Sequence, residues 1–232
     1  MILSNNQIKE TIEKGDIQIS PFENSQVEPA SYDLRVGKFG AATSSKKIVD
    51  IEKQGYIPIE PGDFAIIMVF EEISLGLQYA GRLGLRSKYM RKGLIATTGL
   101  QVDPGYRGHL KIGITNLTPK AISLPFKDDF ISIELHKLEQ PASEPYSGPY
   151  QGQTGLSPED IEAVTEGTGM AFSEVIITLK SLSQNVATLS DDVKSLTTDF
   201  KTMKSTLKGI MWTIPIIVTV GIAIIGIIVT LK

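Results

Sequence analysis

The sequence predicts a mostly β domain, a sandwich or barrel, followed by a long coiled-coil helix and one transmembrane helix. Three observations lead to this fold class. Short apolar runs separated by Gly, Pro and Asp fill about the first two-thirds of the chain, which is typical of strands joined by turns. A seam of apolar residues spaced alternately three and four apart comes next. An uncharged apolar run follows the seam.

Residues 1–156 are predicted to form the β domain. Residues 64–70 and 130–135 are apolar runs of strand length, with turn-forming residues beside both. One early helix is expected over residues 4–14, with Gly15 just beyond its C-terminus. The sum is a compact sandwich or barrel with a small helical addition.

Residues 157–170 are predicted to be a linker that contains a short helix. Ser157 is a good N-cap, and Pro158 suits the first turn because its missing N–H costs nothing there. Gly167 and Gly169 are expected to interrupt this helix, since glycine is a poor helix former.

A coiled-coil stalk is predicted over residues 171–208. Its seam consists of Phe172, Val175, Leu179, Leu182, Val186, Leu189, Val193, Leu196, Phe200, Met203 and Leu207. The alternative is a long helix that lies on the β domain, but such a helix usually has a wider apolar stripe than the strict a/d seam. The residues between the seam positions are mostly Ser, Thr, Asn, Asp and Lys, which favours the coiled coil.

Residues 210–231 contain no charge and are long enough to span a bilayer. Trp212 stands where an interfacial aromatic is expected, and Lys204 and Lys208 precede the run. Almost nothing follows it, so we expect a C-terminal tail anchor with the β domain on the cytoplasmic side. A buried core helix is the alternative, but core helices are rarely so long and so uniformly apolar.

The composition excludes several classes of function. There are no cysteines, so disulfides, zinc thiolate sites and cysteine nucleophiles are excluded. The only histidines are His109 and His136, which argues against a histidine-rich metal site, and no protein-bound metal is expected. The net charge is −3 and no basic stripe is present, so nucleic acid is not an expected partner. The N-terminus lacks the apolar stretch of a secretory signal.

Arg86, Ser87 and Arg91 form the first chemically suggestive cluster. Guanidinium groups and a small hydroxyl together can hold phosphate oxygens. Taken alone, the cluster is better interpreted as a solvated surface turn.

Asp103 lies in an Asp-Pro-Gly sequence, which is standard turn chemistry, so by itself it indicates a turn rather than a catalyst. Tyr106 by itself indicates a core residue. The Gly- and Tyr-rich residues 144–155 could be either a flexible lid over a ligand or a plain linker.

The order and spacing of these clusters change the interpretation. The strings PASYDLRVG at 29–37, VDPGYRG at 102–108 and PYSGPYQGQ at 145–153 are fairly specific individually and strong together. With them, residues 1–155 resemble the trimeric dUTPase and dCTP deaminase superfamily, most closely the archaeal-type dUTPases. The stalk and the anchor lie outside the resemblance.

The resemblance implies a homotrimer with active sites shared between subunits, and deoxyribonucleoside triphosphate substrates bound with Mg²⁺. It implies that Asp103 is catalytic and activates the attacking water. Tyr106 would stack under the deoxyribose, and the backbone from Gly99 to Gln101 would recognise the base.

The remaining motifs are assigned in the same way. Arg86 and Ser87 would hold phosphate oxygens. Tyr150 and Gln151 match the segment that closes over the nucleotide. Asp33 and Arg35 match the first motif and would support the site structurally.

Gly113 separates the two branches of the superfamily. Deaminases of this family place a glutamate at that position as a proton shuttle, and without the carboxylate the cytosine ring lacks its general acid and base. The sequence therefore favours a dUTP diphosphatase, which converts dUTP and water to dUMP and pyrophosphate.

Two alternatives remain. A dCTP deaminase would release ammonia and would need another carboxylate in place of the missing one. A catalytically inactive, nucleotide-binding scaffold is the other, and the altered fourth motif supports it, because Asp129 and Ser132 stand where Arg and Gln are expected.

Overall fold

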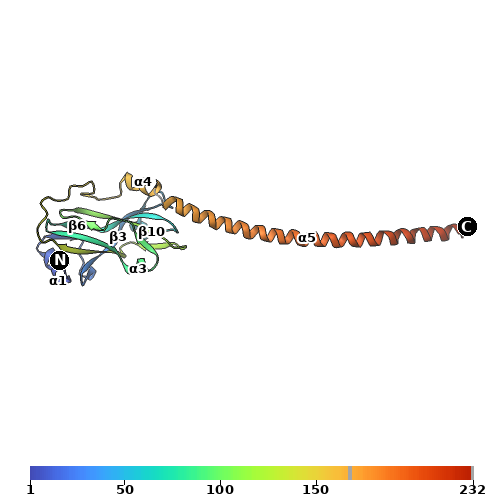
Figure 1. Ribbon diagram of the computed structural model, residues 1–232, viewed down its shortest axis with the longest axis horizontal. Helices are drawn as coiled ribbons and strands as arrows, with labels where there is room; N and C mark the ends of the chain where they lie inside the picture. Colours follow the sequence, from blue (N-terminus) through green and yellow to red (C-terminus); the bar gives the residue numbers. More distant parts are fainter. Residues whose placement is uncertain (167–168, 231–232) are drawn as a thin grey trace. The chain divides into compact units, whose positions relative to one another are not determined.

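The computed structural model describes the backbone of residues 1–166 and 169–230, and the side chains of residues 1–165 and 175–226. The chain divides into two units, Met1–Ile176 and Ile177–Lys232. The first unit holds all the strands, which confirms the mostly β prediction for this part of the chain (Figure 1). The strands are β1 (Ile17–Ser20), β2 (Val27–Glu28), β3 (Ser31–Ala42), β4 (Ile48–Asp50), β5 (Tyr56–Ile59), β6 (Phe64–Leu75), β7 (Tyr79–Leu85), β8 (Leu94–Ala96), β9 (Gln101–Val102), β10 (Arg107–Asn116), β11 (Ile122–Pro125) and β12 (Asp129–Lys137).

Ten of these strands form one curled antiparallel sheet in the order β8-β10-β6-β3-β12-β7-β9, with β1 on β6 and with β2 and β4 on β3. Strands β5 and β11 form a separate pair. β3 connects the two halves of the large sheet, because Tyr32–Arg35 pair with β12 whereas Val36–Ala42 pair with β6. A register shift between Val36 and Gly40 marks the point where the sheet curls.

The core lies inside this curl. Burial alternates along residues 69–75 of β6 and 131–136 of β12, as the period of two requires, and Tyr32, Ile67 and Phe130 are among the fully buried side chains. The inner face is almost entirely Ile, Leu and Val with a few aromatic rings. Residues 64–70 and 130–135, which the sequence predicts as strands, lie within β6 and β12.

Short helices lie before, between and after the strands. They are α1 (Asn5–Glu13), the 3₁₀ helix η1 (Asn24–Gln26), α2 (Ile51–Gln54), α3 (Ser87–Met90) and α4 (Pro158–Glu166). α1 confirms the expected early helix: Ser4 and Gln7 form a capping box, and Gly15 follows with φ of +79°. α4 begins after Ser157, as predicted.

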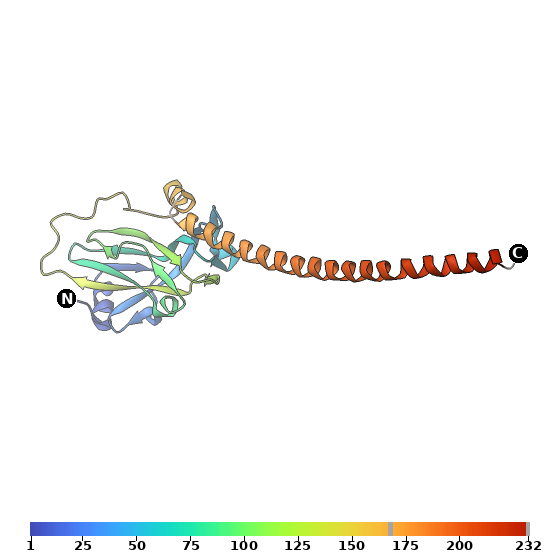
Figure 2. The ribbon, with the colours of Figure 1, turned by 45° about the vertical axis from the view of Figure 1, so that its right-hand side comes forward.

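α4 is packed against β3 and β6 (Figures 1 and 2). Val164 is fully buried beside Ala41 and Ile66, and Ile161 packs against the same small cluster. The predicted linker is therefore not a free tether in its helical part, because one face of α4 is buried on the sheet.

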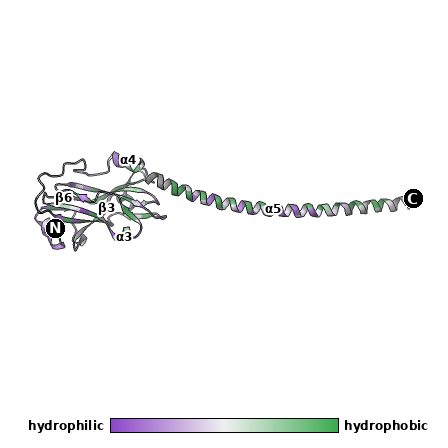
Figure 3. Ribbon diagram, viewed as in Figure 1, coloured by the Kyte–Doolittle hydropathy of each residue, from purple (hydrophilic) through white to green (hydrophobic). Residues whose placement is uncertain are grey.

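The last element is α5 (Gly169–Thr230), a single helix of 62 residues. The expected interruption at Gly167 lies outside the described residues, and Gly169 begins α5 instead of breaking a helix. Pro215 lies inside the helix. Val175–Gly226 is long and apolar enough to cross a membrane by length and composition, and the charged residues within it precede residue 210 (Figure 3).

The seam residues of α5 from Val175 to Leu207 are all exposed in the single chain. The side chain of Phe172 lies outside the described residues. Because no partner chain is present to cover this seam, the coiled coil stays a prediction.

Candidate functional site

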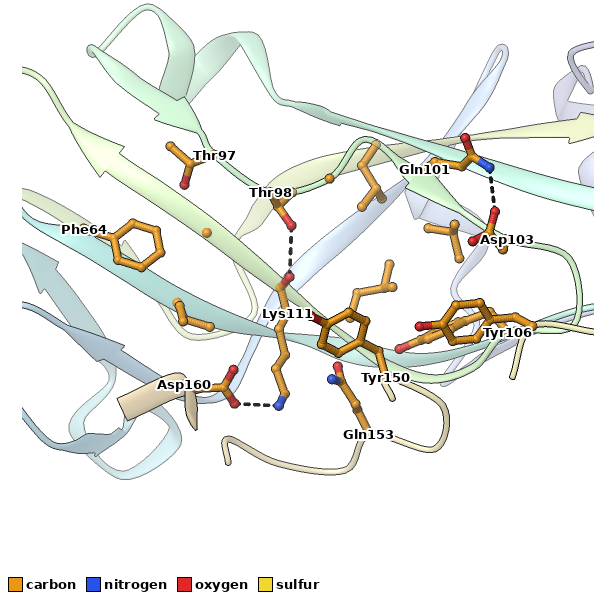
Figure 4. A pocket seen from close by; sticks show the side chains of 17 residues that line it. Phe64, Thr97, Thr98, Gln101, Asp103, Tyr106, Lys111, Tyr150, Gln153 and Asp160 are labelled. Atoms are coloured by element: carbon orange, nitrogen blue, oxygen red, sulfur yellow. Dashed lines mark hydrogen bonds and ion pairs between the residues drawn. The ribbon is translucent and has the colours of Figure 1, made fainter. Parts of the chain in front are cut away.

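A pocket of about 560 Å³ opens between β10, the loop before it, the segment after β12 and α4 (Figure 4). Five of the predicted catalytic and substrate-binding residues line it: Gly99, Gln101, Asp103, Tyr106 and Tyr150. Arg86, Ser87, Arg91 and Gln151 do not line it. Residues 102–108 and 145–153 thus meet at one cavity, and the cluster of Arg86, Ser87 and Arg91 lies elsewhere on the same chain.

Asp103 and Tyr106 lie at one end of this pocket (Figure 4). The Gln101 Nε2 donates to Asp103 Oδ1 at 2.5 Å, which fixes the carboxylate at the turn. Tyr106 is buried and its hydroxyl donates to the His109 carbonyl at 2.9 Å. Burial raises the pKa of the Tyr106 hydroxyl, so this ring offers a neutral, fixed surface and not an acid.

The glycines of VDPGYRG explain why this motif and residues 145–153 come together. Gly108 has φ of +141°, and a Cβ placed on it would lie 2.7 Å from the Gln153 nitrogen. The Gly152 N–H donates to the Arg107 carbonyl at 2.7 Å, and the His109 N–H donates to the Gln153 carbonyl at 2.9 Å. The segment after β12 is therefore hydrogen-bonded to β10 along its backbone, which a plain linker would not be.

Gly108→Ala is expected to lower the free energy of unfolding by about 1–3 kcal/mol, because a side chain meets both a strained φ and the backbone of Gln153. It should also free the segment after β12, which limited proteolysis within residues 145–155 would detect. Gly84→Ala is the matched control, since its Cβ would meet nothing within 4 Å. Equal protease resistance of the two variants would contradict this account of the motif.

The other end of the pocket carries an ion pair that the sequence analysis missed. Lys111 Nζ donates to Asp160 Oδ2 at 2.5 Å, joining β10 to α4. The Ser157 N–H and hydroxyl donate to the same oxygen at 2.6 and 3.0 Å. Burial acts to raise the pKa of Asp160, but the hydrogen bonds from Lys111 and Ser157 outweigh it and hold this pKa below its usual value.

Gly113 forms part of the wall between the two ends. A Cβ built there would lie 2.8 Å from the Thr97 hydroxyl oxygen and 3.1 Å from Phe64 Cε2. A larger side chain at this position would require both neighbours to move. The pocket wall therefore has little room for a carboxylate side chain at position 113. Asp160 supplies a carboxylate to the same pocket from α4.

Arg86 is held at a different place. It forms ion pairs with Asp33 and with Glu28, the latter at 3.7 Å. The Ser132 hydroxyl donates to Asp33 Oδ1 at 2.5 Å, so the altered fourth-motif residue fixes a first-motif carboxylate. Asp129 lies opposite Arg35 in the strand register.

Arg35 lies at the junction of β3 and β6. Its Nε donates to Glu71 Oε1 at 2.6 Å, its backbone N–H donates to Glu71 Oε2 at 3.0 Å, and a further pair reaches Glu23. Burial raises the pKa of Glu71, although Arg35 acts in the opposite direction. The Arg35 Nη2 is buried without a hydrogen-bond partner among the described residues. None of the three residues Arg35, Glu71 and Glu23 lines the pocket, so we assign this cluster a structural role.

Comparisons with known proteins agree on one family. A family model described as dCTP deaminase-like matches residues 2–127. A Pyrococcus horikoshii protein named dCTP deaminase is 37% identical over 141 residues, covering 61% of this chain and 88% of that protein. An Aquifex aeolicus protein named dCTP deaminase, dUMP-forming, is 31% identical over 171 residues, covering 69% of this chain and 95% of that protein.

The crystal structure of 2′-deoxycytidine 5′-triphosphate deaminase from Agrobacterium tumefaciens shares the fold, with a TM-score of 0.51 and 18% identity. The match covers 59% of this chain and 48% of the Agrobacterium chain, so this protein spans about half of that chain's length. This likeness shows the fold alone.

The expected assignment to dUTP hydrolysis is wrong, because the relatives are named dCTP deaminases. The error came from treating Gly113 as proof that the site lacks an additional carboxylate. In the folded chain Asp160 lines the same pocket, although it follows Gly113 by 47 positions in the sequence and lies beyond the matched residues 2–127.

Proposed function

Since this chain belongs to the dCTP deaminase-like family, we propose that its β domain binds dCTP and replaces the 4-amino group of the cytosine ring by oxygen from water, releasing ammonia. The observation that carries this proposal is the convergence of two sequence motifs, VDPGYRG and PYSGPYQGQ, on one pocket that also holds two carboxylates. A pocket of about 560 Å³ is of the size that small organic ligands use.

The end of the pocket at Tyr106 suits the sugar of a nucleoside, and the end at Asp160 suits the polar edge of its base. Tyr106 packs with Tyr146 at 5.9 Å between ring centroids and with the ring planes 56° apart, which makes an angled aromatic surface against which a sugar or base can pack. Asp103 lies beside this surface. Polar groups at the opposite end, on Lys111 and Asp160, would face the edge of the base.

The triphosphate requires cations that this pocket does not supply within one chain. None of the described residues that line it is an arginine, and Lys111 is the one lysine among them. We therefore include in the proposal that a second copy contributes Arg86 and Arg91, so that the site forms between subunits of a homotrimer. Charge neutralisation of this kind is what phosphate binding needs.

Mg²⁺ is proposed to arrive with the nucleotide. The described residues contain no group of three or more His, Asp or Glu side chains that could hold a metal ion. A hard cation bound through phosphate oxygens needs few protein ligands, so the site fits Mg²⁺ only as a partner of the triphosphate.

We further propose that α5 trimerises through its heptad seam and anchors the protein in a membrane, with the β domain on the cytoplasmic side. The seam supports the first part, because its apolar residues are exposed in the single chain. The uncharged stretch from residue 210 and the lysines that precede it support the second.

The test is to incubate the full chain in detergent micelles with dCTP or dUTP and Mg²⁺, and to follow ammonia and the nucleotide products. We expect ammonia from dCTP. Nucleotide binding without ammonia would contradict the proposal and favour the second candidate, a nucleotide-binding scaffold without turnover. The crowded wall at Gly113 is the specific observation in favour of that candidate.

A further inference from the structure

We propose that Asp160 determines which pyrimidine the pocket prefers, by accepting a hydrogen bond from the exocyclic amino group of a cytosine base. This inference rests on the proposed function, in that a pyrimidine nucleotide must occupy the pocket. It does not depend on turnover, because it concerns recognition of the base and not its chemistry.

Asp160 is held at the pocket by two independent sets of contacts. On one side, Val164 and Ile161 of the same helix pack α4 onto Ala41 and Ile66 of the sheet. On the other, Lys111 reaches across from β10 to the carboxylate. The Asp160 side chain is only 17% exposed, so the group is fixed in a partly dry site.

The two oxygens of this carboxylate differ. Oδ2 accepts all three hydrogen bonds, one from Lys111 and two from Ser157. No hydrogen bond reaches Oδ1 from the residues whose side chains are described. An ionised carboxylate has about four acceptor positions, so Oδ1 keeps its full capacity to accept. Figure 4 shows the paired oxygen directed at Lys111 and the other directed away from it.

An acceptor of this kind distinguishes cytosine from uracil. The 4-position of cytosine carries an NH₂ donor, whereas uracil carries a carbonyl acceptor at the same place. A carbonyl facing Oδ1 would bring two acceptors together, which is unfavourable where water is excluded. Across the pocket, the Thr98 hydroxyl donates to the Lys111 carbonyl at 3.3 Å. The Thr97 hydroxyl can rotate to suit either base, so it does not discriminate.

The location of Asp160 has a consequence for the family. α4 lies beyond the residues 2–127 that the family model matches, so the preference for the base would reside outside that span. The strands would then provide the surfaces for stacking and for the sugar, and α4 would provide the selection.

The experiment measures equilibrium binding of dCTP and dUTP to the full chain, with ammonia followed in the same samples to correct for conversion. The wild type should bind dCTP at least about tenfold more tightly than dUTP. In Asp160→Asn the amide oxygen takes over the contacts with Lys111 and Ser157, so the NH₂ group should face the base. The preference should therefore reverse, with dUTP bound more tightly than dCTP.

Glu159→Gln is the matched control, because it removes an exposed acid from the same turn of α4 and should leave the ratio unchanged. Thermal melting reports whether Asp160→Asn still folds. A third arm needs no variant: the 2-pyrimidinone analogue of dCTP, which lacks the 4-amino group, should bind the wild type at least about tenfold more weakly than dCTP.

An unchanged dCTP to dUTP ratio in a folded Asp160→Asn variant, or equal affinity of the wild type for dCTP and the 2-pyrimidinone analogue, would overturn the inference. A wild type that prefers dCTP but releases no ammonia would refute the deaminase function while supporting the role of Asp160. The two proposals can therefore fail separately.

Discussion

Arg35→Met is expected to lower the free energy of unfolding by about 3–5 kcal/mol, because it leaves the buried carboxylate of Glu71 without its cation. Glu71 is fully buried and lies on β6, so it cannot reach water without opening the sheet. Chemical denaturation of the detergent-solubilised chain would measure the loss. Nucleotide binding is a second readout, since the cluster lies outside the pocket and any folded fraction should still bind.

The loss should depend on pH in a defined direction. Without Arg35, the folded-state pKa of Glu71 rises further above the usual value of 4.5. A carboxyl whose folded pKa is raised stabilises most below the unfolded pKa, and this stabilisation disappears as the pH rises through the folded pKa. The variant should therefore be closest to the wild type near pH 4.5 and should fall behind it as the pH rises.

Lys38→Met provides the control for this prediction. Lys38 pairs with Glu52 at 3.1 Å, but the two side chains are 45% and 49% exposed. Such a pair contributes about 0–1 kcal/mol. If Arg35→Met cost no more than Lys38→Met, burial of the Arg35–Glu71 pair would not explain the stability of the β3–β6 junction.

The double variant Ile217→Arg, Ile224→Arg is expected to move the protein from the membrane fraction to the soluble fraction. Both residues lie in the uncharged part of α5, and each arginine near the centre of a span costs about 2.5–3.5 kcal/mol. The combined cost is large enough to reverse insertion. Fractionation of cells that express the full chain, followed by alkaline extraction of the membranes, would measure the shift.

Thr198→Arg, Ser205→Arg is the control, because these two exposed residues lie outside the heptad seam and before the uncharged stretch. It adds the same charge to the same helix and should leave the protein in the membrane. Recovery of the wild type in the soluble fraction, or retention of the Ile217→Arg, Ile224→Arg variant in the membrane, would contradict the anchor.

The local elements of this protein follow from sequence signals. The capping box at Ser4 and the Ser157 cap mark where α1 and α4 begin. Apolar runs between turns give the strands, because alternation and turn chemistry act over a few residues. The boundary between stalk and anchor is different: the sequence separates them by charge, but the backbone continues as one helix through both.

Asp103 and Tyr106 could be placed at a site only through the resemblance that VDPGYRG carries, because each residue alone indicates a turn or the core. Arg86 could not be excluded from that pocket by any local pattern. Its ion pairs with Asp33 and Glu28 join strands that are more than fifty residues apart in the chain. Only the pairing of β3 with β12, and of β12 with β7, brings these residues together.

The sequence by itself determined the mostly β domain, its turns, the heptad seam and the apolar stretch, since each is a periodicity or a composition that a short window contains. The tertiary structure alone decided that Asp160 meets Lys111 across the pocket from Asp103. Ser157 and Asp160 look in the sequence like an ordinary helix start. Because Val164 is buried on the sheet, the first turn of α4 faces the cavity. This burial depends on contacts with strands far away in the sequence, so no short window of the sequence contains it.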